Sequence, residues 1–369
     1  MRILITCGGT GGHIFPAIGL AQELKRAGHP DSIFVIDNSV TNKELIRKAG
    51  FDVLVLDVPK MPYGLSRKWP QFIIKLITSR LNAAPIIAKI NPDIAVGFGA
   101  YISGPVIQAA ASVGIKTLIH EQNAFLGRAN RILFNIVDRV ALSFNNPLIK
   151  KNAKCVLTGI PIRHQLRDGF KTVTNDQALK AFRFSRKRKT LLVLGGSSGA
   201  FAINKAMVDM VKILDSKQKD SIQILHISGH KDHDMVEHAY RMNNIIYWVR
   251  GFCDNMTLLY KASDMVISRA GAATISEIAF FGIPTLFIPY PWAGSHQKDN
   301  ATLIAREGAA VILKESGLSP KKLQDSIFSI INDEEGMRRM IKNTRIFSRP
   351  DAAKNLAAAV TELFNAKQS

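Results

Sequence analysis

The chain has 369 residues and carries 49 Lys and Arg against 29 Asp and Glu, a formal net charge of +20 at pH 7. Hydrophobic residues make up 47% of it, which excludes an intrinsically disordered chain and, at about 100–200 residues per domain, suggests two domains or three. The charge favours an anionic partner such as a phosphate-rich substrate, nucleic acid or an acidic membrane. The three cysteines are far apart without a C-x-x-C spacing, which argues against disulfides or zinc and indicates a reducing compartment.

The first half of the chain alternates short apolar strands with helices. Strands are predicted at residues 2–6, 32–36, 53–56, 94–96 and 117–119. The uncharged stretch 94–115 is long enough to span a bilayer, but its glycines and Pro105 divide it into a strand, a glycine loop and a helix. The N-terminus lacks the apolar run of a secretory signal. The pattern predicts a parallel sheet covered on both faces, in a protein that is soluble or at most peripheral to a membrane.

The same pattern restarts in the second half. Strands are predicted at residues 189–194, 222–226, 265–267 and 284–288, and a second glycine loop begins at Gly195 as the first begins at Gly8. We expect an N-terminal domain of residues 1–160, a C-terminal domain of residues 161–350, and a C-terminal helix of residues 351–369 that could pack on either domain. The basic run 183–189 is interpreted as a solvated loop, because no nucleic-acid motif accompanies it.

Each half places a glycine loop between its first strand and a helix, an arrangement that can cradle a phosphate. Neither loop has the G-x-G-x-x-G or P-loop spacing. Two such loops favour a ligand in a cleft between two domains, although two tight turns without a ligand remain the alternative. His13, at the end of the first loop, could serve as a general base near neutral pH or could simply be packed.

Polar residues also follow later strands, where α/β proteins carry their sites. Within the run 120–123, His120 and Glu121 are expected to have structural roles. Arg163 is either a surface charge or a phosphate ligand. The segment 268–277 combines small residues with a helix start, and Glu277 could accept hydrogen bonds from a ribose diol or cap the helix.

Six motifs come in one order between Gly8 and Asn300. They are the segments 8–13, 99–105, 120–123, 195–197 and 269–277, and His296-Gln297 with Asn300. Together they resemble the MurG family of bacterial UDP-N-acetylglucosamine transferases, which act on undecaprenyl-pyrophosphoryl-MurNAc-pentapeptide. The resemblance implies a GT-B fold, in which two Rossmann-like domains face a cleft, with the lipid-linked acceptor on the N-terminal domain and UDP-GlcNAc on the C-terminal one. It also implies inverting transfer of GlcNAc to the C4 hydroxyl of MurNAc.

The resemblance assigns site residues as well. Inversion in one displacement needs one base near the acceptor hydroxyl, for which His13 is the candidate. Asn123 and Gln297 would contact the GlcNAc, Arg163 the diphosphate and Glu277 the ribose. The donor-binding candidates are Thr10, Gly11, Gly12, Asn123, Arg163, Ser197, Cys253, Ala272, Ala273, Thr274, Ile275, Ser276, Glu277 and Gln297.

Three departures from the family pattern concern the donor contacts rather than the reaction. Ser198 stands in place of a glutamine, Phe125-Leu126 in place of a proline-glycine pair, and Cys253 in place of an aliphatic residue that offers a backbone contact to uracil. Neither a metal nor another cofactor is expected, because a helix N-terminus with Arg163 can stabilise the departing diphosphate.

Three alternatives stay open. A dinucleotide-dependent oxidoreductase is supported by Asp37 at the end of the second strand but opposed by the glycine spacing. A UDP-GlcNAc 2-epimerase would share the fold, although its acidic catalytic residues are not evident. A non-catalytic, membrane-associated binding protein is the third alternative.

The stretch 58–92 has basic residues but no acidic one. It contains an apolar loop followed by a helix from Trp69, in which Phe72, Ile73 and Leu76 are expected to pack on the sheet. Anionic lipids attract basic residues, and apolar side chains enter the lipid interface. The undecaprenyl-linked acceptor that the resemblance implies would require the enzyme to work at a bilayer surface. We therefore predict peripheral binding to the cytoplasmic face of the inner membrane, through Met61, Tyr63, Leu65, Arg67, Lys68 and Trp69.

Overall fold

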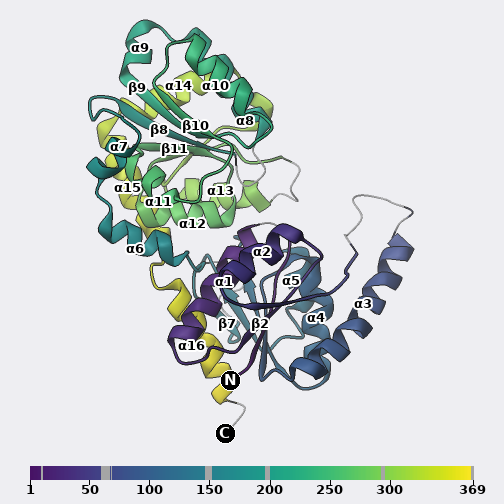
Figure 1. Ribbon diagram of the computed structural model, residues 1–369. Coiled ribbons are helices and arrows are strands. Elements are labelled where there is room, and N and C mark those ends of the chain that lie inside the picture. The colour runs from purple at the N-terminus through teal and green to yellow at the C-terminus, as the bar shows by residue number, and fades with distance from the viewer. Residues whose placement is uncertain are drawn as a thin grey trace. The chain divides into compact units, whose positions relative to one another are not determined.

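The computed structural model describes residues 1–9, 11–59, 67, 69–145, 152–195, 200–291 and 296–366. The chain forms two compact units. Residues 1–163 and 349–369 form the first unit, and residues 164–348 form the second. Each unit is built on a parallel sheet with helices on both faces, so the predicted class of two Rossmann-like domains is confirmed (Figure 1).

The described part of the first unit has a seven-stranded sheet in the order β3-β2-β1-β4-β5-β6-β7. The inner strands β1 and β4 are buried along their whole length, which accounts for the absence of charged residues in both and for the apolar run Ile3–Ile5 of β1. The order reverses between β1 and β4, the point at which open α/β sheets bind ligands beyond the carboxyl ends of their strands. The strands are β1 (Ile3–Thr6), β2 (Ser32–Ile36), β3 (Asp52–Val55), β4 (Ile94–Gly97), β5 (Lys116–Glu121), β6 (Arg139–Leu142) and β7 (Cys155–Leu157).

The helices of the first unit alternate with these strands. The uncharged stretch 94–115 forms β4 and α4, as predicted. Among the residues that the structure describes, no helix has the length and apolar character needed to cross a bilayer. The helices are α1 (Gly11–Arg26), α2 (Val40–Lys48), α3 (Trp69–Ile90), α4 (Ala100–Ser112), α5 (Arg128–Leu133) and α16 (Ala352–Asn365).

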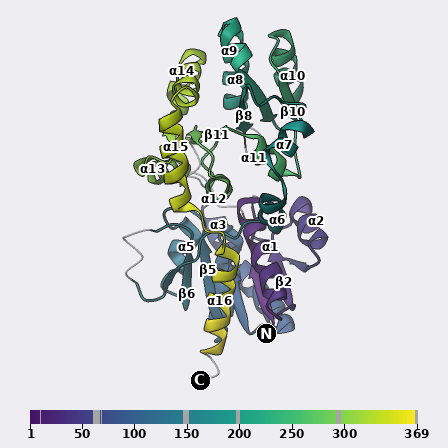
Figure 2. The same cartoon turned by 90° about the vertical axis from the view of Figure 1, so that its left-hand side faces the viewer.

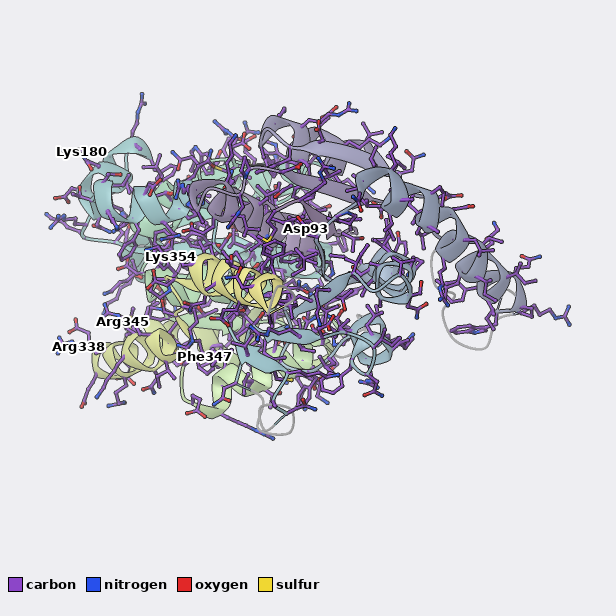
Figure 3. The ribbon with its side chains drawn as sticks, turned by 90° about the horizontal axis from the view of Figure 1, so that it is seen from below. Asp93, Lys180, Arg338, Arg345, Phe347 and Lys354 are labelled. Carbon is purple, nitrogen blue, oxygen red and sulfur yellow. The ribbon has the colours of Figure 1, made fainter. Side chains whose placement is uncertain are left out.

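The C-terminal helix α16 completes the first unit. It lies beside α1 and contacts β5 and β6 (Figures 1 and 2). Leu356, Val360 and Leu363 share one helical face and are buried in the same apolar cluster as Ile3. Lys354, on the opposite side of the helix, is exposed (Figure 3). The C-terminal helix therefore packs on the N-terminal domain, one of the two placements expected.

The second unit repeats the sheet of the first. Its described strands follow the order β10-β9-β8-β11-β12-β13, which reverses between β8 and β11. The short strands β10 and β13 were not predicted from the sequence. The strands are β8 (Lys189–Leu194), β9 (Ile222–Ile227), β10 (Tyr247–Arg250), β11 (Met265–Ser268), β12 (Thr285–Phe287) and β13 (Val311–Ile312).

The basic run 183–189 leads into β8 and is partly paired with acids. Arg186 forms an ion pair with Asp176, and Arg188 lies 3.2 Å from Asp220.

The helices of the second unit are α6 (His164–Thr172), α7 (Asn175–Ala181), α8 (Phe201–Ile213), α9 (Ser216–Ser221), α10 (His233–Met242), α11 (Met256–Ala262), α12 (Ala272–Phe281), α13 (His296–Arg306), α14 (Pro320–Ile331) and α15 (Glu334–Thr344), with 3-10 turns at Glu315–Gly317 and Arg345–Phe347.

His226 on β9 joins the sheet of the second unit to two helices. Its Nδ1 lies 2.8 Å from the Tyr240 hydroxyl of α10, and its Nε2 lies 3.0 Å from Oδ1 of Asn204 on α8. The ring is fully buried, and desolvation lowers the pKa of His226 to about 3. The folded protein therefore holds this histidine uncharged at neutral pH.

We predict that His226 makes the second unit sensitive to acid. In the unfolded chain a histidine gains its proton near pH 6.5, whereas folded His226 stays neutral until about pH 3, so the unfolded state binds more protons between these values. The stabilisation is complete above about pH 6.5 and is lost as the pH falls, at about 1.4 kcal/mol of unfolding free energy per pH unit.

Denaturant titrations at pH about 7 and about 5 measure this loss. His226→Gln should show a smaller decrease between the two values than the parent. The exposed His238 on α10 provides the control, since His238→Gln should keep the parental pH dependence. Equal decreases in the parent and His226→Gln would contradict the prediction.

Candidate functional site

His13 lies in the first turn of α1, beyond the carboxyl end of β1. It is half-buried, and its Nδ1 is 3.1 Å from Oε1 of Gln122, which follows β5. The ring also lies next to Gly99, which follows β4: a Cβ at Gly99 would come within 3.4 Å of the ring Cε1. Gly99 has φ 77°, in the left-handed region that favours glycine. The segment 99–105 therefore begins with a residue whose backbone conformation favours glycine and which lies in van der Waals contact range of the His13 ring.

Gln122 connects His13 to a second, fully buried histidine. Its Nε2 lies 3.1 Å from the carbonyl oxygen of Phe98 and 3.1 Å from Nδ1 of His120. Nε2 of His120 in turn lies 2.9 Å from the carbonyl oxygen of Gly159. Desolvation lowers the pKa of His120 to about 4, although the hydrogen bond to Gly159 acts in the other direction. His120 is therefore neutral at physiological pH.

Glu121 holds the loop that follows β5. One carboxylate oxygen accepts hydrogen bonds from the amide and the side chain of Asn123, at 2.9 and 3.0 Å. The other accepts from the amide of Gly127 and the side chain of Asn130, both at 2.8 Å. This buried carboxylate thus has four donors, and it orients the candidate residue Asn123. The contacts agree with the structural roles expected of His120 and Glu121.

Asp37, which supported the oxidoreductase alternative, holds the first glycine loop. Its Oδ2 lies 3.3 Å from the amide nitrogen of Gly9 and 3.1 Å from the hydroxyl of Tyr101. Burial, reinforced by the Asp37 charge, raises the pKa of Tyr101 to about 12. A dinucleotide-binding loop offers such amides to a pyrophosphate, whereas here a carboxylate of the protein accepts from one of them.

Arg163 lies near the first turns of α1. Its guanidinium carbon is 4.6 Å from the ring centroid of Phe15. A Cβ at Gly11 would come within 2.8 Å of the same ring, so a larger residue there would require the Phe15 side chain to move. Gly11 and Gly12 both belong to α1, and Thr10 lies outside the described residues.

The reversal point of the second unit carries the N-terminus of α12. The helix follows Gly271, has no side-chain cap, and has no acidic residue in its first turn. Its first amide groups are therefore suited to an anion. Ala273 and Thr274 are partly exposed, whereas the side chains of Ala272, Ile275 and Ser276 are buried.

The loop before α12 is held from two sides. Arg269 is buried, forms an ion pair with Glu315, and donates to the carbonyl oxygen of Ile288 at 2.9 Å. Asn300 on α13 donates to the carbonyl oxygen of Ala270 at 3.2 Å. Because both anchors are buried, the start of α12 has a defined position in the second unit.

Glu277 lies on α12 and accepts a hydrogen bond from the hydroxyl of Tyr260, 2.8 Å from its Oε2. Tyr260 is buried on α11 and was not predicted as a site residue. Gln297, at the start of α13, accepts from the amide of Tyr290 at 2.9 Å. Cys253 lies half-buried between β10 and α11, and Ser197 is outside the described residues.

The sequence contains one Asp-x-Asp, Asp232-His233-Asp234, a spacing that metal-dependent transferases use. Asp232 accepts a hydrogen bond from Asn204 at 2.7 Å, and the side chain of Asp234 is exposed. Within the described ranges, no group of three or more His, Cys, Asp or Glu residues could hold a metal ion.

The predicted membrane segment is described only in part. Arg67 is exposed, Trp69 packs edge-on against Phe72, and Met61, Tyr63, Leu65 and Lys68 lie outside the described residues. Phe72 is buried as expected, but the expectation for Ile73 is wrong: its side chain is 52% exposed.

Ile73 is exposed because α3 packs against α4 with another of its faces. The buried residues of α3 include Phe72, Ser79, Ala83 and Ile87, and Ile73 is turned about 100° from Phe72. The exposed side carries four large apolar side chains, which we call the α3 apolar face: Ile73 (52% exposed), Ile74 (62%), Ile77 (57%) and Leu81 (66%).

Comparison with known proteins gives matches to both halves of the chain. The model of the glycosyltransferase family 28 N-terminal domain matches residues 3–142, and that of the family 28 C-terminal domain matches residues 190–356. A Desulforamulus reducens protein named UDP-N-acetylglucosamine–N-acetylmuramyl-(pentapeptide) pyrophosphoryl-undecaprenol N-acetylglucosamine transferase is 35% identical over 100% of both chains.

Solved structures match over the same length. The crystal structure of Acinetobacter baumannii MurG has a TM-score of 0.77 and 25% identity, covering 98% of this chain and 99% of that one. A UDP-GlcNAc 2-epimerase from Neisseria meningitidis has a TM-score of 0.67 and 15% identity, covering 98% and 100%. At that identity the epimerase match bears on the fold alone.

Proposed function

Since the chain belongs to the UDP-N-acetylglucosamine–N-acetylmuramyl-(pentapeptide) pyrophosphoryl-undecaprenol N-acetylglucosamine transferases, we propose that it transfers GlcNAc from UDP-GlcNAc to the C4 hydroxyl of MurNAc in undecaprenyl-pyrophosphoryl-MurNAc-pentapeptide, with inversion. It is a hexosyltransferase of peptidoglycan synthesis and converts lipid I into lipid II. The observation that carries this proposal is the 35% identity to the Desulforamulus reducens transferase over the full length of both chains. Each half of this chain also matches a glycosyltransferase family 28 domain.

The second unit binds UDP-GlcNAc in this proposal. The uncapped N-terminus of α12 suits the diphosphate, whose negative charge increases as UDP departs. Glu277, oriented by the Tyr260 hydroxyl, suits the ribose diol as a hydrogen-bond acceptor. Gln297, on the neighbouring helix α13, and Asn123 of the first unit are the proposed GlcNAc contacts, and Arg163 of the first unit is a proposed diphosphate ligand.

The first unit supplies the acceptor site and the base. His13 is a half-buried imidazole at the sheet's reversal point, where its position is held by Gln122. A neutral imidazole can take the proton of the C4 hydroxyl as that oxygen attacks the anomeric carbon of GlcNAc and UDP leaves from the opposite face. One base and one displacement account for inversion.

The same unit binds the membrane in this proposal. An acceptor on an undecaprenyl chain requires the enzyme to work at a lipid surface, at the cytoplasmic face of the inner membrane. The α3 apolar face exposes large side chains beside Lys75 and Arg80, and the net charge of +20 favours anionic lipids.

Turnover with UDP-GlcNAc and the lipid-linked MurNAc acceptor tests the proposed reaction. The parent should release UDP and form the disaccharide-lipid, whereas ManNAc formation would indicate an epimerase and NAD reduction would indicate an oxidoreductase.

We predict that His13→Ala lowers kcat by about 10²–10⁴, the usual contribution of a general base, with donor binding nearly unchanged. A decrease of less than about tenfold would remove His13 from the role of base.

We predict that Glu277→Ala weakens binding of UDP much more than binding of the acceptor. Each hydrogen bond to a charged acceptor contributes about 1.5–3 kcal/mol, so the dissociation constant should rise at least about tenfold in calorimetry. Tyr260→Phe removes only the orienting hydroxyl and should have a smaller effect. Unchanged UDP affinity in folded Glu277→Ala would refute the ribose contact.

We predict that the double variant Ile77→Ser with Leu81→Ser loses binding to anionic vesicles by at least about tenfold, because two apolar side chains no longer enter the interface. Co-sedimentation with and without added salt measures this. A variant of two exposed apolar residues of the second unit, Ile213→Ser with Met242→Ser, is the matched control and should bind like the parent. Parental binding by the α3 variant would exclude this face as the anchor.

A further inference from the structure

We propose that Gln122 and His120 are positioning residues that fix His13 as the Nδ1–H tautomer, so that the neutral ring presents Nε2 as its proton acceptor. The proposal rests on the function proposed above, in which His13 is the base. It adds two residues to the mechanism that touch neither the proton nor the sugar.

The direction of the hydrogen bonds follows from two main-chain carbonyl oxygens, because a carbonyl can only accept. Nε2 of His120 lies 2.9 Å from the Gly159 carbonyl oxygen and must therefore carry a hydrogen. His120 is buried and neutral, with a pKa lowered to about 4, so it carries that single hydrogen. Its Nδ1 is therefore an acceptor.

The Phe98 carbonyl oxygen fixes the side-chain amide of Gln122 in the same way. The amide atom 3.1 Å from this oxygen must be the NH₂ group, since a carbonyl oxygen there would face another acceptor. The second hydrogen of the NH₂ group is directed to Nδ1 of His120, also at 3.1 Å. Both donors of Gln122 are thereby used within the interior of the first unit.

Only the oxygen of Gln122 then faces His13. It lies 3.1 Å from Nδ1, so Nδ1 must donate, and in the neutral ring the lone pair is on Nε2. A carboxylate in the same place would orient the ring too, but it would add a negative charge next to the base. The amide determines the tautomer without that charge.

Nitrogen NMR of the full-length protein with ¹⁵N-labelled histidine tests the tautomer directly. At a pH about two units above the ordinary histidine pKa, long-range ¹H–¹⁵N correlations distinguish the two tautomers, and loss of signals in His13→Gln assigns the residue. We expect the Nδ1–H form for His13 and the Nε2–H form for His120. The Nε2–H form for His13 in the parent would overturn the proposal without any variant.

Gln122→Met tests the cause, because it keeps the length of the side chain and removes the amide. His13 should then shift toward the Nε2–H form, and kcat should fall about tenfold or more, with the KM for UDP-GlcNAc within about twofold of the parent. Gln223, also fully buried, donates to Ser185 and Thr190 in the second unit, so Gln223→Met is the matched control for loss of a buried amide. It should leave the His13 tautomer and kcat unchanged.

The two readouts separate this proposal from the proposed function. If Gln122→Met leaves the His13 tautomer unchanged, or if Gln223→Met alters it to the same extent, the positioning role is overturned. If the tautomer depends on Gln122 while His13→Ala keeps its activity, the role of His13 as base fails and the positioning of its ring stands. If Gln122→Met does not fold, the tautomers in the parent decide the outcome.

Discussion

In both sheets every strand pairs in parallel with its neighbours. The carboxyl ends of all strands in a unit therefore lie at the same edge of its sheet. The helices begin at that same edge, so main-chain amides and polar side chains gather beyond the strands while the strands themselves stay apolar and buried. In each unit the order reverses next to the first strand, between β1 and β4 and between β8 and β11. His13 and α12 lie at these two reversal points, and every residue that we assign to the reaction depends on this arrangement.

The residues proposed to act on the substrates are held by residues that do not. Glu121 orients Asn123, Tyr260 orients Glu277, and Arg269 anchors the loop before α12. The side chains of these positioning residues are buried. Most of them form hydrogen bonds with main-chain atoms, whose positions the sheet determines. A buried polar group costs stability unless its partners are in place, so such supports also select a single conformation of the loops.

The sequence predicted the fold because the strands that carry it are buried on both faces and contain unbroken apolar runs, such as residues 191–194 of β8. It did not predict β6, β7, β10 and β13. Three of these, β7, β10 and β13, lie at sheet edges, where packing on one side leaves a weaker pattern, whereas β6 is an inner strand whose short run begins with a charged residue, Arg139. Ile73 was misjudged because helical spacing identifies a face without stating which neighbour covers it.

The site was predictable only in part. His13 and Glu277 occur in motifs, and the motifs indicated them. Tyr260 carries no signal of its own, because its role depends on a contact with another helix, and the link from Gln122 to His13 spans 109 positions of sequence. Such partners become visible when the fold brings together residues whose chemistry is complementary, and no local pattern encodes that meeting.

The return of α16 to the first unit has a consequence for synthesis on the ribosome. The apolar cluster that contains Ile3 needs Leu356, Val360 and Leu363, and these are made after the entire second unit. The nascent first unit therefore waits, with uncovered apolar surface, through translation of 185 further residues from 164 to 348. The second unit is formed by one continuous segment of the chain and can reach its final fold before α16 is made. The first unit, although it is translated first, therefore completes its folding last.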